Sequence, residues 1–510
     1  MSRQQYKIAG KKGLIMMSVI LLMVVLAASS CKKFLSTYSQ NKVFIQTAAD
    51  LDELLLGDGY MSVFNQENPP FWVDLLDDDV EENPSSIVSG ANLIFESAGI
   101  HHWQQLPFTK SDGSAWEDGY YTAMYKKISV LNTILYNIPG IQQKGEPADT
   151  LQRISGEAHF LRAYYYFILS NFYGRPYSVS TAANDLSVPL KTDPAVEDKR
   201  FARSSVKQVY EQIVKDLLDS ERELATHNQQ SAIRANQASA QALLSRVYLY
   251  MEDYENAITY ANKVIGKNPY RVVNQNNFAS GTAFLKKAST ETIFALPDRG
   301  QLGLSYRMFS SGDVSRIDNF RVSPDLKNSY TANDLRLQVF FLHSPSGELL
   351  TRKGGTTPDL IEEMLIRLPE LYLIKAEALA VLGRTGEAVN ALQELRKNRF
   401  KPEHLTAITE TGAALVNYIR DERRRELCFE WQRWFDLKRY GVNAKFPFGK
   451  AIRHISYAYD NAGRYIQGYY ELKAYEQDKP AYVIPIPRVE IEFNAGALSN
   501  EPRPDRPLIR

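Results

Sequence analysis

Side chains that could do chemistry are present in this sequence, but they form none of the spacings that catalytic or metal sites require. Seven histidines occur in 510 residues, and none lies in an H-E-x-x-H or a Cys/His zinc spacing. No G-x-S-x-G turn and no glycine-rich phosphate loop is found. His101 and His102 are adjacent, and we interpret them as polar surface residues. We therefore expect no catalytic residue, no metal and no cofactor, although paired carboxylates of the glycosidase type have no fixed spacing to search for.

A short acidic run is the second chemical feature. Asp77-Asp78-Asp79 is followed closely by Glu81 and Glu82. Their oxygens could bind Ca²⁺, but the spacing matches no calcium loop. We interpret these carboxylates as solvated or helix-capping residues.

A basic run, Arg423-Arg424-Arg425, could indicate a nucleic-acid surface. Its acidic neighbours argue against this function. Asp421 and Arg425 are spaced i,i+4 and Glu422 and Arg425 are spaced i,i+3, so the charges can compensate along one helix. The whole chain carries a formal charge of only +1. We therefore expect no nucleic-acid partner.

The N-terminus has the order of a bacterial export signal. Four basic residues precede an apolar run from Gly13 to Leu26, and small residues then lead into Cys31. This order predicts a signal peptide over residues 1–30 and acyl chains on Cys31. Ala28 departs from the pattern, because a Leu is usual three residues before such a cysteine. The alternative is an uncleaved membrane-spanning anchor, since residues 13–30 are nearly long enough to cross a bilayer.

Lipidation of Cys31 would set several properties of the mature chain. Loss of residues 1–30 removes four positive charges and lowers the formal charge from +1 to −3. Cys428 is the only other cysteine, so no intramolecular disulfide could form. Acyl chains bind bilayers by about 0.8 kcal/mol per buried methylene, and two or more chains anchor firmly. We therefore expect a water-soluble body on a membrane tether.

The elements that must position these side chains are mostly helices. Apolar residues recur every three or four positions, most clearly over 151–172. Irregular stretches cover 57–115, the last 60 residues and 270–360, the last with short strand-like runs such as Thr292–Leu296. Pro139-Gly140 is expected to stop one helix. The predicted helices are 46–56, 116–138, 151–172, 204–225, 236–251, 254–266, a pair over 361–398, and a long helix over 411–440.

Two stretches repeat a helix-turn-helix pattern typical of tetratricopeptide units. In the first, small residues at Ser245 and Ala257 would let two helices cross closely. In the second, Ala376 and Ala388 flank a turn at Gly383. The fold class predicted is mostly α: a tetratricopeptide-like helical-repeat scaffold with a loop-rich, irregular second half. Such scaffolds bind other molecules and seldom catalyse; an unrelated helical bundle is the alternative.

The predicted helix over 411–440 carries a family resemblance. Its segment from Glu422 to Gly441, ERRRELCFEWQRWFDLKRYG, resembles the signature helix of the SusD/RagB family of Bacteroidetes lipoproteins. Three other pieces agree in order. They are CKKFL over 31–35, EAHFLRA over 157–163 with Tyr173-Gly174 and Pro176 after it, and IPIP over 484–487. The resemblance covers essentially all of residues 31–510.

The resemblance implies a domain plan. Residues 1–30 would be the lipoprotein signal peptide and 31–45 a tether. Residues 46–270 would form the SusD-like N-terminal helical region with the tetratricopeptide-like repeats. Residues 271–510 would form the SusD/RagB C-terminal region, with a further helical repeat and the signature helix over 411–440.

The resemblance also implies a role. The protein would be lipid-anchored on the outer face of the outer membrane, bind an oligosaccharide, and deliver it to a SusC-like TonB-dependent transporter without cutting it. Some relatives bind peptides, so a peptide ligand is one alternative. A lipid-anchored protein-assembly factor is another, because the repeats could hold a second protein.

Sugar rings stack their C–H faces on aromatic side chains and bond their hydroxyls to polar ones, so aromatic residues in loops are candidates. No ligand-binding residue is fixed by a family motif. An aromatic candidate could instead pack in the core, and a polar candidate could instead lie in an ordinary solvated loop. We expect core packing for Trp116, Trp431 and Trp434. The candidate ligand-binding residues are Trp72, Trp103, Tyr306 and Phe309 for stacking and Asn274, Asn276 and Arg307 for polar contacts.

Overall fold

The computed structural model describes most of the chain after residue 44. The described residues are 45–60, 72–84, 93–116, 119–195, 199–228, 231–279, 282–297, 320–343, 347, 349–355, 359–362, 364–460 and 463–510. Cys31, the predicted signal peptide and all but the last residue of the predicted tether lie outside these ranges. Among the described residues, no helix combines the length and apolarity needed to cross a membrane.

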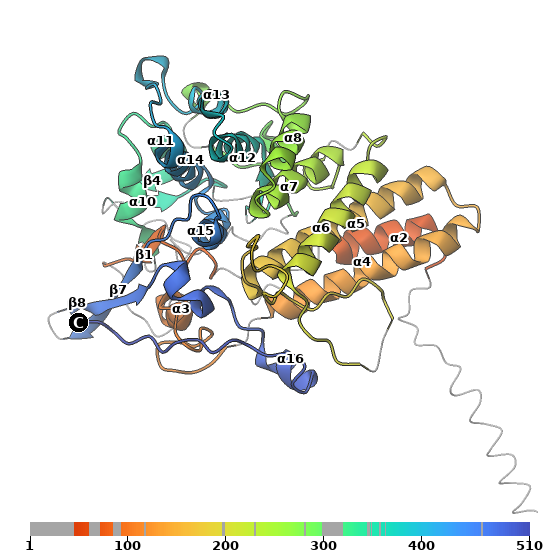
Figure 1. Ribbon diagram of the computed structural model, residues 1–510, viewed down its shortest axis with the longest axis horizontal. Helices are drawn as coiled ribbons and strands as arrows, with labels where there is room; N and C mark the ends of the chain where they lie inside the picture. The colour runs from red at the N-terminus through yellow and green to blue at the C-terminus, as the bar shows by residue number, and fades with distance from the viewer. Residues whose placement is uncertain are drawn as a thin grey trace, which may run out of the picture.

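Helices in antiparallel succession form the scaffold, from α4 and α5 at one end to α13 and α14 at the other (Figure 1). Each packs on the next, and α8 is followed in space by α12 although some hundred residues separate them in sequence. The scaffold helices are α2 (Ala48–Leu54), α4 (Tyr120–Gln142), α5 (Ala148–Tyr173), α6 (Val206–Glu223), α7 (Gln237–Tyr250), α8 (Tyr254–Val264), α12 (Leu368–Val381), α13 (Thr385–Arg396) and α14 (Gly412–Leu427). A π-helical turn, Leu55–Tyr60, continues α2.

The repeat interpretation is confirmed at the helix crossing. The Ser245 hydroxyl on α7 donates a hydrogen bond of 2.8 Å to the carbonyl of Ala257 on α8, and both residues are fully buried. The mostly α, tetratricopeptide-like fold with a loop-rich second half is therefore confirmed. One helix end was predicted wrongly, because α4 runs through Pro139-Gly140 to Gln142. Pro139 cannot donate to the carbonyl four residues earlier, but only three helical residues follow it, so the disruption is confined to the last turn.

The second half is built from short pairs of strands and short helices. Each sheet within the described residues has two antiparallel strands. The pairs are β1 (Val80–Glu82) with β3 (Phe320–Val322), β2 (Thr292–Phe294) with β6 (Ile366–Arg367), β4 (Phe341–His343) with β5 (Leu349–Thr351), and β7 (Ile452–Asp460) with β8 (Gly463–Leu472). The short helices are α3 (Leu93–His101), α10 (Pro324–Ser329), α11 (Arg336–Val339), α15 (Gln432–Val442) and α16 (Arg488–Phe493).

Two segments that the sequence predicted as irregular are ordered. The 57–115 stretch contains β1 and α3, and the last 60 residues contain the β7–β8 hairpin. Inward-facing positions of β7 alternate with outward ones, but they include His454 and Ser456. These polar residues hide the apolar alternation by which a strand is recognised.

The predicted long helix over 411–440 is two helices. It breaks between Leu427 and Gln432, where Phe429 and Trp431 have φ angles of 60° and 61°. A left-handed conformation is costly for such bulky residues, so packing must hold the turn. The turn buries Glu430, which forms ion pairs with Arg367 and Lys353. A continuous helix could not place the consecutive side chains of Phe429, Glu430 and Trp431 all in the interior.

Candidate ligand-binding site

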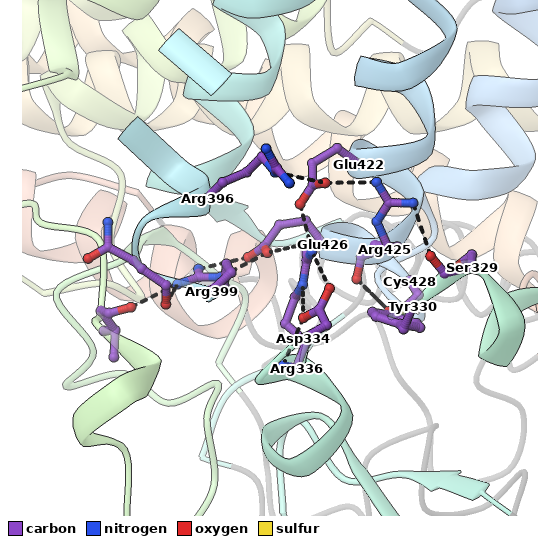
Figure 2. A network of polar contacts seen from close by, with 12 residues as sticks. Ser329, Tyr330, Asp334, Arg336, Arg396, Arg399, Glu422, Arg425, Glu426 and Cys428 are labelled. Atoms are coloured by element: carbon purple, nitrogen blue, oxygen red, sulfur yellow. Dashed lines mark hydrogen bonds and ion pairs between the residues drawn. The ribbon is translucent and has the colours of Figure 1, made fainter. Parts of the chain in front are cut away.

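Buried ion pairs join the signature helices to the loop-rich half. Figure 2 shows Glu426 of α14 among the guanidinium groups of Arg336 and Arg399, and Arg367 also reaches it. These four side chains are fully buried. Although burial alone would raise the pKa of Glu426, Arg399 and Arg367 hold it well below its usual range. This network fixes the framework from which the loops extend.

The basic run over 423–425 makes no exposed patch. Arg425 pairs with Glu422 at 2.8 Å, as the i,i+3 spacing predicted. Most of the compensation, however, comes from other elements rather than from α14. Arg423 pairs with Asp436 of α15 at 2.8 Å, and Arg424 reaches Asp79 at 2.7 Å.

The acidic run is buried, and its interpretation as solvated or helix-capping was wrong. Asp77, Asp78 and Asp79 are at most 6% exposed. Asp78 pairs with Arg433 at 2.7 Å and Asp79 with Arg424 at 2.7 Å. Burial opposes ionisation of Asp78, yet the arginines hold its pKa well below the usual range. Arg433 and Arg424 thus supply buried positive charge to Asp78 and Asp79.

A cavity of about 630 Å³ lies between α3, the loop that follows it, and the β7–β8 hairpin. Its volume is typical of small-molecule sites. Rings and amides predominate among its polar lining, a combination suited to a hydroxyl-rich ligand. The lining includes Glu82, Phe95, His102, Gln104, Gln105, Thr109, Lys110, Ser111, Ser456, Tyr457, Gln467 and Tyr470.

The C-terminal segment holds this cavity together. Gln104 and Gln105 donate side-chain hydrogen bonds of 3.3 Å to the carbonyls of Arg506 and Arg503. Farther on, Ile509 pairs with Tyr469 on β8 through two backbone bonds of 2.9 Å. Gly468 allows this approach, because a Cβ there would lie 2.3 Å from the Ile509 carbonyl oxygen.

His101 and His102 were wrongly interpreted as surface residues. They are 1% and 7% exposed, respectively. The His101 ring stacks on His454 of β7 at 3.9 Å, and the His102 ring stacks on Tyr470 of β8 at 4.2 Å. Burial lowers the pKa of His454 to about 4. Histidine is intermediate in its tendency to be buried, so only knowledge of the hairpin that covers these rings could have placed them.

Trp72 and Trp103 belong to the core, the alternative that the sequence left open. Both are 0% exposed, so neither ring can stack on a ligand in this structure. Trp103 packs on His454 at 4.1 Å, and its indole nitrogen donates to the Leu76 carbonyl at 2.9 Å. Trp103 nevertheless lies between two residues that line the cavity.

The other candidates lie away from this cavity or outside the described residues. Asn274 and Asn276 are exposed and bond to one another at 2.8 Å at a short 3₁₀ turn, Gln275–Asn277. Tyr306, Arg307 and Phe309 lie outside the described residues. The expected core positions of Trp431 and Trp434 are confirmed, and Trp116 is partly buried against the core. The cavity residues from 102 to 111 and from 456 to 470 were not predicted.

Comparisons with known proteins place both halves of the chain. Residues 33–249 match a family model described as starch-binding associating with outer membrane, and residues 348–502 match the SusD family model. SusD-like protein P2 of Formosa agariphila is 25% identical over 449 residues, which are 78% of this chain and 82% of that protein. SusD-like protein P25 of the same organism is 20% identical over an alignment that includes 95% of this chain and 98% of that protein.

Solved structures share the fold. A putative sugar binding protein from Bacteroides vulgatus superposes with a TM-score of 0.69 at 22% identity, covering 90% of this chain and 99% of its own. A SusD superfamily protein from Bacteroides thetaiotaomicron gives a TM-score of 0.67 at 23% identity. This superposition covers 90% of this chain and 100% of the other. The two family models, matched in order along one chain of this fold, show that the protein belongs to the SusD/RagB family.

Proposed function

We propose that the protein binds an oligosaccharide in the cavity between α3 and the β7–β8 hairpin. The observation that carries this proposal is the lining, in which the partly exposed rings of Tyr457 and Tyr470 stand beside the amides of Gln104, Gln105 and Gln467. Aromatic rings offer faces for sugar C–H groups, and amides can donate to and accept from sugar hydroxyls. The starch-binding description of the matching family model supports the same class of ligand.

The cavity walls are preorganised, which lowers the cost of binding. Gln467 donates a hydrogen bond of 2.8 Å to Ser456 across the hairpin, and Tyr470 is stacked on His102. Side chains held in place lose less conformational freedom when a ligand arrives. This arrangement contains no pair of groups that we assign to bond cleavage, so we propose capture without hydrolysis.

Calorimetric titration of the purified protein tests this function. The titrants are maltoheptaose, cellohexaose, xylohexaose and mannohexaose. We expect micromolar affinity for at least one of them, and a loss of about tenfold in Tyr470→Ala and Gln105→Ala, since each removes one stacking or hydrogen-bonding group. Gln143→Ala, on the exposed end of α4, is the control and should bind as wild type.

Two outcomes would overturn parts of this proposal. Retention of peptides from a casein digest, with no binding to any of the four glycans, would replace the sugar by a peptide. Release of shorter sugars during incubation with a bound glycan would replace capture by hydrolysis, and chromatography of the mixture detects it.

We further propose that acyl chains on Cys31 hold the protein at the outer face of the outer membrane, beside a SusC-like TonB-dependent transporter. The N-terminal order of basic, apolar and small residues supports the lipid anchor. The description of the matching family model, which names the outer membrane, supports the proposed location. Affinity purification from native outer membranes is expected to recover a TonB-dependent barrel. Recovery of a different stable partner instead would favour an assembly factor.

A further inference from the structure

Three side chains that could coordinate a metal converge beneath the cavity. Glu82 ends β1, His101 ends α3, and His102 follows it. One carboxylate oxygen and one ring nitrogen from each histidine all lie within 4.8 Å of one another. The Glu82 oxygen is 3.2 Å from Nε2 of His102. All three residues are at least nine-tenths buried, so this is an interior cluster rather than a chance grouping on the surface.

The hydrogen bonding of His101 leaves one nitrogen available. Its Nδ1 lies 3.0 Å from the carbonyl oxygen of Leu75. A carbonyl can only accept, so Nδ1 carries the hydrogen and Nε2 presents a lone pair. That Nε2 atom is buried and has no hydrogen-bond partner. A carbonyl behind a histidine is the usual way in which proteins orient a metal-binding imidazole.

The neighbouring elements hold both imidazoles in position. His454 of β7 stacks on His101, and Tyr470 of β8 stacks on His102. Imidazoles held in place by these ring contacts lose little rotational freedom when an ion arrives.

We propose that Glu82, His101 and His102 bind a divalent transition-metal ion, with Zn²⁺ as the best match. Two imidazole nitrogens and one carboxylate oxygen suit zinc, whereas Ca²⁺ and Mg²⁺ prefer oxygen ligands alone. Ligand atoms of a tetrahedral zinc site lie roughly 3.4 Å apart, so modest side-chain rotation closes the cluster. Glu82 and His102 line the cavity, which gives the ion a path of entry and leaves its fourth position open to water.

The nearby Asp77-Asp78-Asp79 cluster makes a useful contrast. Its carboxylate oxygens also lie within 4.8 Å of one another. Arginine side chains already neutralise it, through Arg433 and Arg424. The Glu82 cluster instead offers two imidazole nitrogens beside one carboxylate, so the two clusters should differ in metal preference.

The test is metal binding to untagged, EDTA-treated protein. Calorimetric titration with ZnCl₂ and elemental analysis after dialysis should both give one equivalent of zinc. Glu82→Gln and His102→Gln keep the side-chain size but remove a ligand, and each should weaken binding by tenfold or more. His404→Gln, which alters an exposed histidine in a 3₁₀ turn, should leave binding unchanged. CaCl₂ should give no heat at the same concentrations.

A second measurement keeps the proposal testable if a variant fails to fold. Cobalt(II) added to wild-type protein should give the intense visible absorption of a four-coordinate N,O site, and zinc should displace it. Absence of stoichiometric zinc binding, or equal zinc affinity in wild type, Glu82→Gln and His102→Gln, would overturn the site. The cluster would then be only a close contact between His102 and Glu82.

Discussion

Glu426 accepts hydrogen bonds from three arginines that come from three separate segments of the chain: Arg336, Arg367 and Arg399. The four groups are fully buried. Desolvating such charges is costly, and the cost is recovered only while every partner is present. The intact network thus adds little to the free energy of unfolding, but removing one of its members should lower that free energy strongly.

Replacing Glu426 by Gln should therefore be among the most damaging single changes in the framework. We expect the free energy of unfolding to fall by about 3–5 kcal/mol, because three buried guanidinium groups each lose one of their carboxylate partners. Urea denaturation followed by circular dichroism measures it. Glu394→Gln breaks an exposed pair with Lys397 and should cost less than about 0.5 kcal/mol. Similar losses in the two variants would contradict the proposed role of burial.

For individual residues, the sequence predicted ion pairs between neighbours on one helix but missed ion pairs between residues far apart in the chain. The Glu422–Arg425 pair follows from i,i+3 spacing and was confirmed. The partners of Asp78 and Asp79 lie about 350 residues away on α14 and α15. No rule based on local spacing can identify partners at that distance. The acidic run was therefore interpreted as solvated, although its partners neutralise it in the core.

Among the elements, α5 packs tightly at Gly156 against the C-terminal end of α6. A Cβ at this position would lie 2.7 Å from Cγ of Leu224, just beyond the end of α6. A methyl group there must push the helices apart or force Leu224 out of its rotamer. The small residue is thus a packing requirement of the scaffold.

Gly156→Ala should lower the free energy of unfolding by about 1–3 kcal/mol through overpacking. The matched control is Gly140→Ala on α4, where a Cβ would meet nothing within 4 Å. There the same substitution should stabilise the protein by roughly 0.4–1 kcal/mol, since alanine loses less backbone entropy on folding. Denaturation midpoints that move in the same direction for both variants would refute the packing argument.

Glu377 joins three elements: it lies on α12 and pairs with Arg420 of α14 and Arg439 of α15. Burial would raise the pKa of Glu377, but these arginines lower it to about 2. An unfolded glutamate titrates near pH 4.3. The group therefore stabilises the fold above about pH 5, and this contribution is lost as the pH falls toward 2.

Glu377→Gln should therefore unfold more easily than wild type at pH 7, by about 3 kcal/mol. The difference should shrink as the pH falls from 5 to 3, because wild type then loses the same contribution. Urea midpoints at pH 7, 5, 4 and 3 measure this. Glu387→Gln, which removes an exposed partner of Arg384, should track wild type throughout. A gap between Glu377→Gln and wild type that does not change with pH would show that the carboxylate's charge is not the cause.

Sequence reasoning was most successful for amphipathic helices and least for elements that carry polar residues inward. The predicted helix over 151–172 corresponds to α5, because its apolar period is unbroken. The turn between α14 and α15 has no glycine or proline to mark it. Tertiary contacts of Glu430 hold that turn, and local propensity cannot reveal them.

Across the whole molecule, the candidate cavity depends on segments far apart in sequence. One wall comes from Glu82 and residues 94–113 and the other from residues 456–470. The C-terminal segment ties them together, since Arg506 accepts a bond from Gln104 and Ile509 pairs with Tyr469. The family could be recognised from the signature segment together with three shorter motifs that occur in the expected order. The site could not, because neither wall carries a motif and each is unremarkable until the fold brings them side by side.

Anchoring is a property of the whole molecule, and it can be separated from binding. Cys31→Ser should release the protein from the membrane pellet into the supernatant, because the variant lacks the thiol that would carry the proposed acyl chains. The variant should still bind any glycan that wild type binds, since residue 31 lies far along the chain from the cavity walls. Intact-mass analysis of wild type should show a chain that starts at an acylated Cys31.

An opposite result would identify the alternative anchor. If Cys31→Ser stayed in the pellet after an alkaline carbonate wash, and its mass included residues 1–30, the apolar run from Gly13 would be an uncleaved membrane span. The body would then be held by a helix rather than by lipid. A stretch of about 30 further residues would also remain on the chain, and the formal charge would be +1 rather than −3. The two anchors thus differ in mass, in charge and in their response to one substitution.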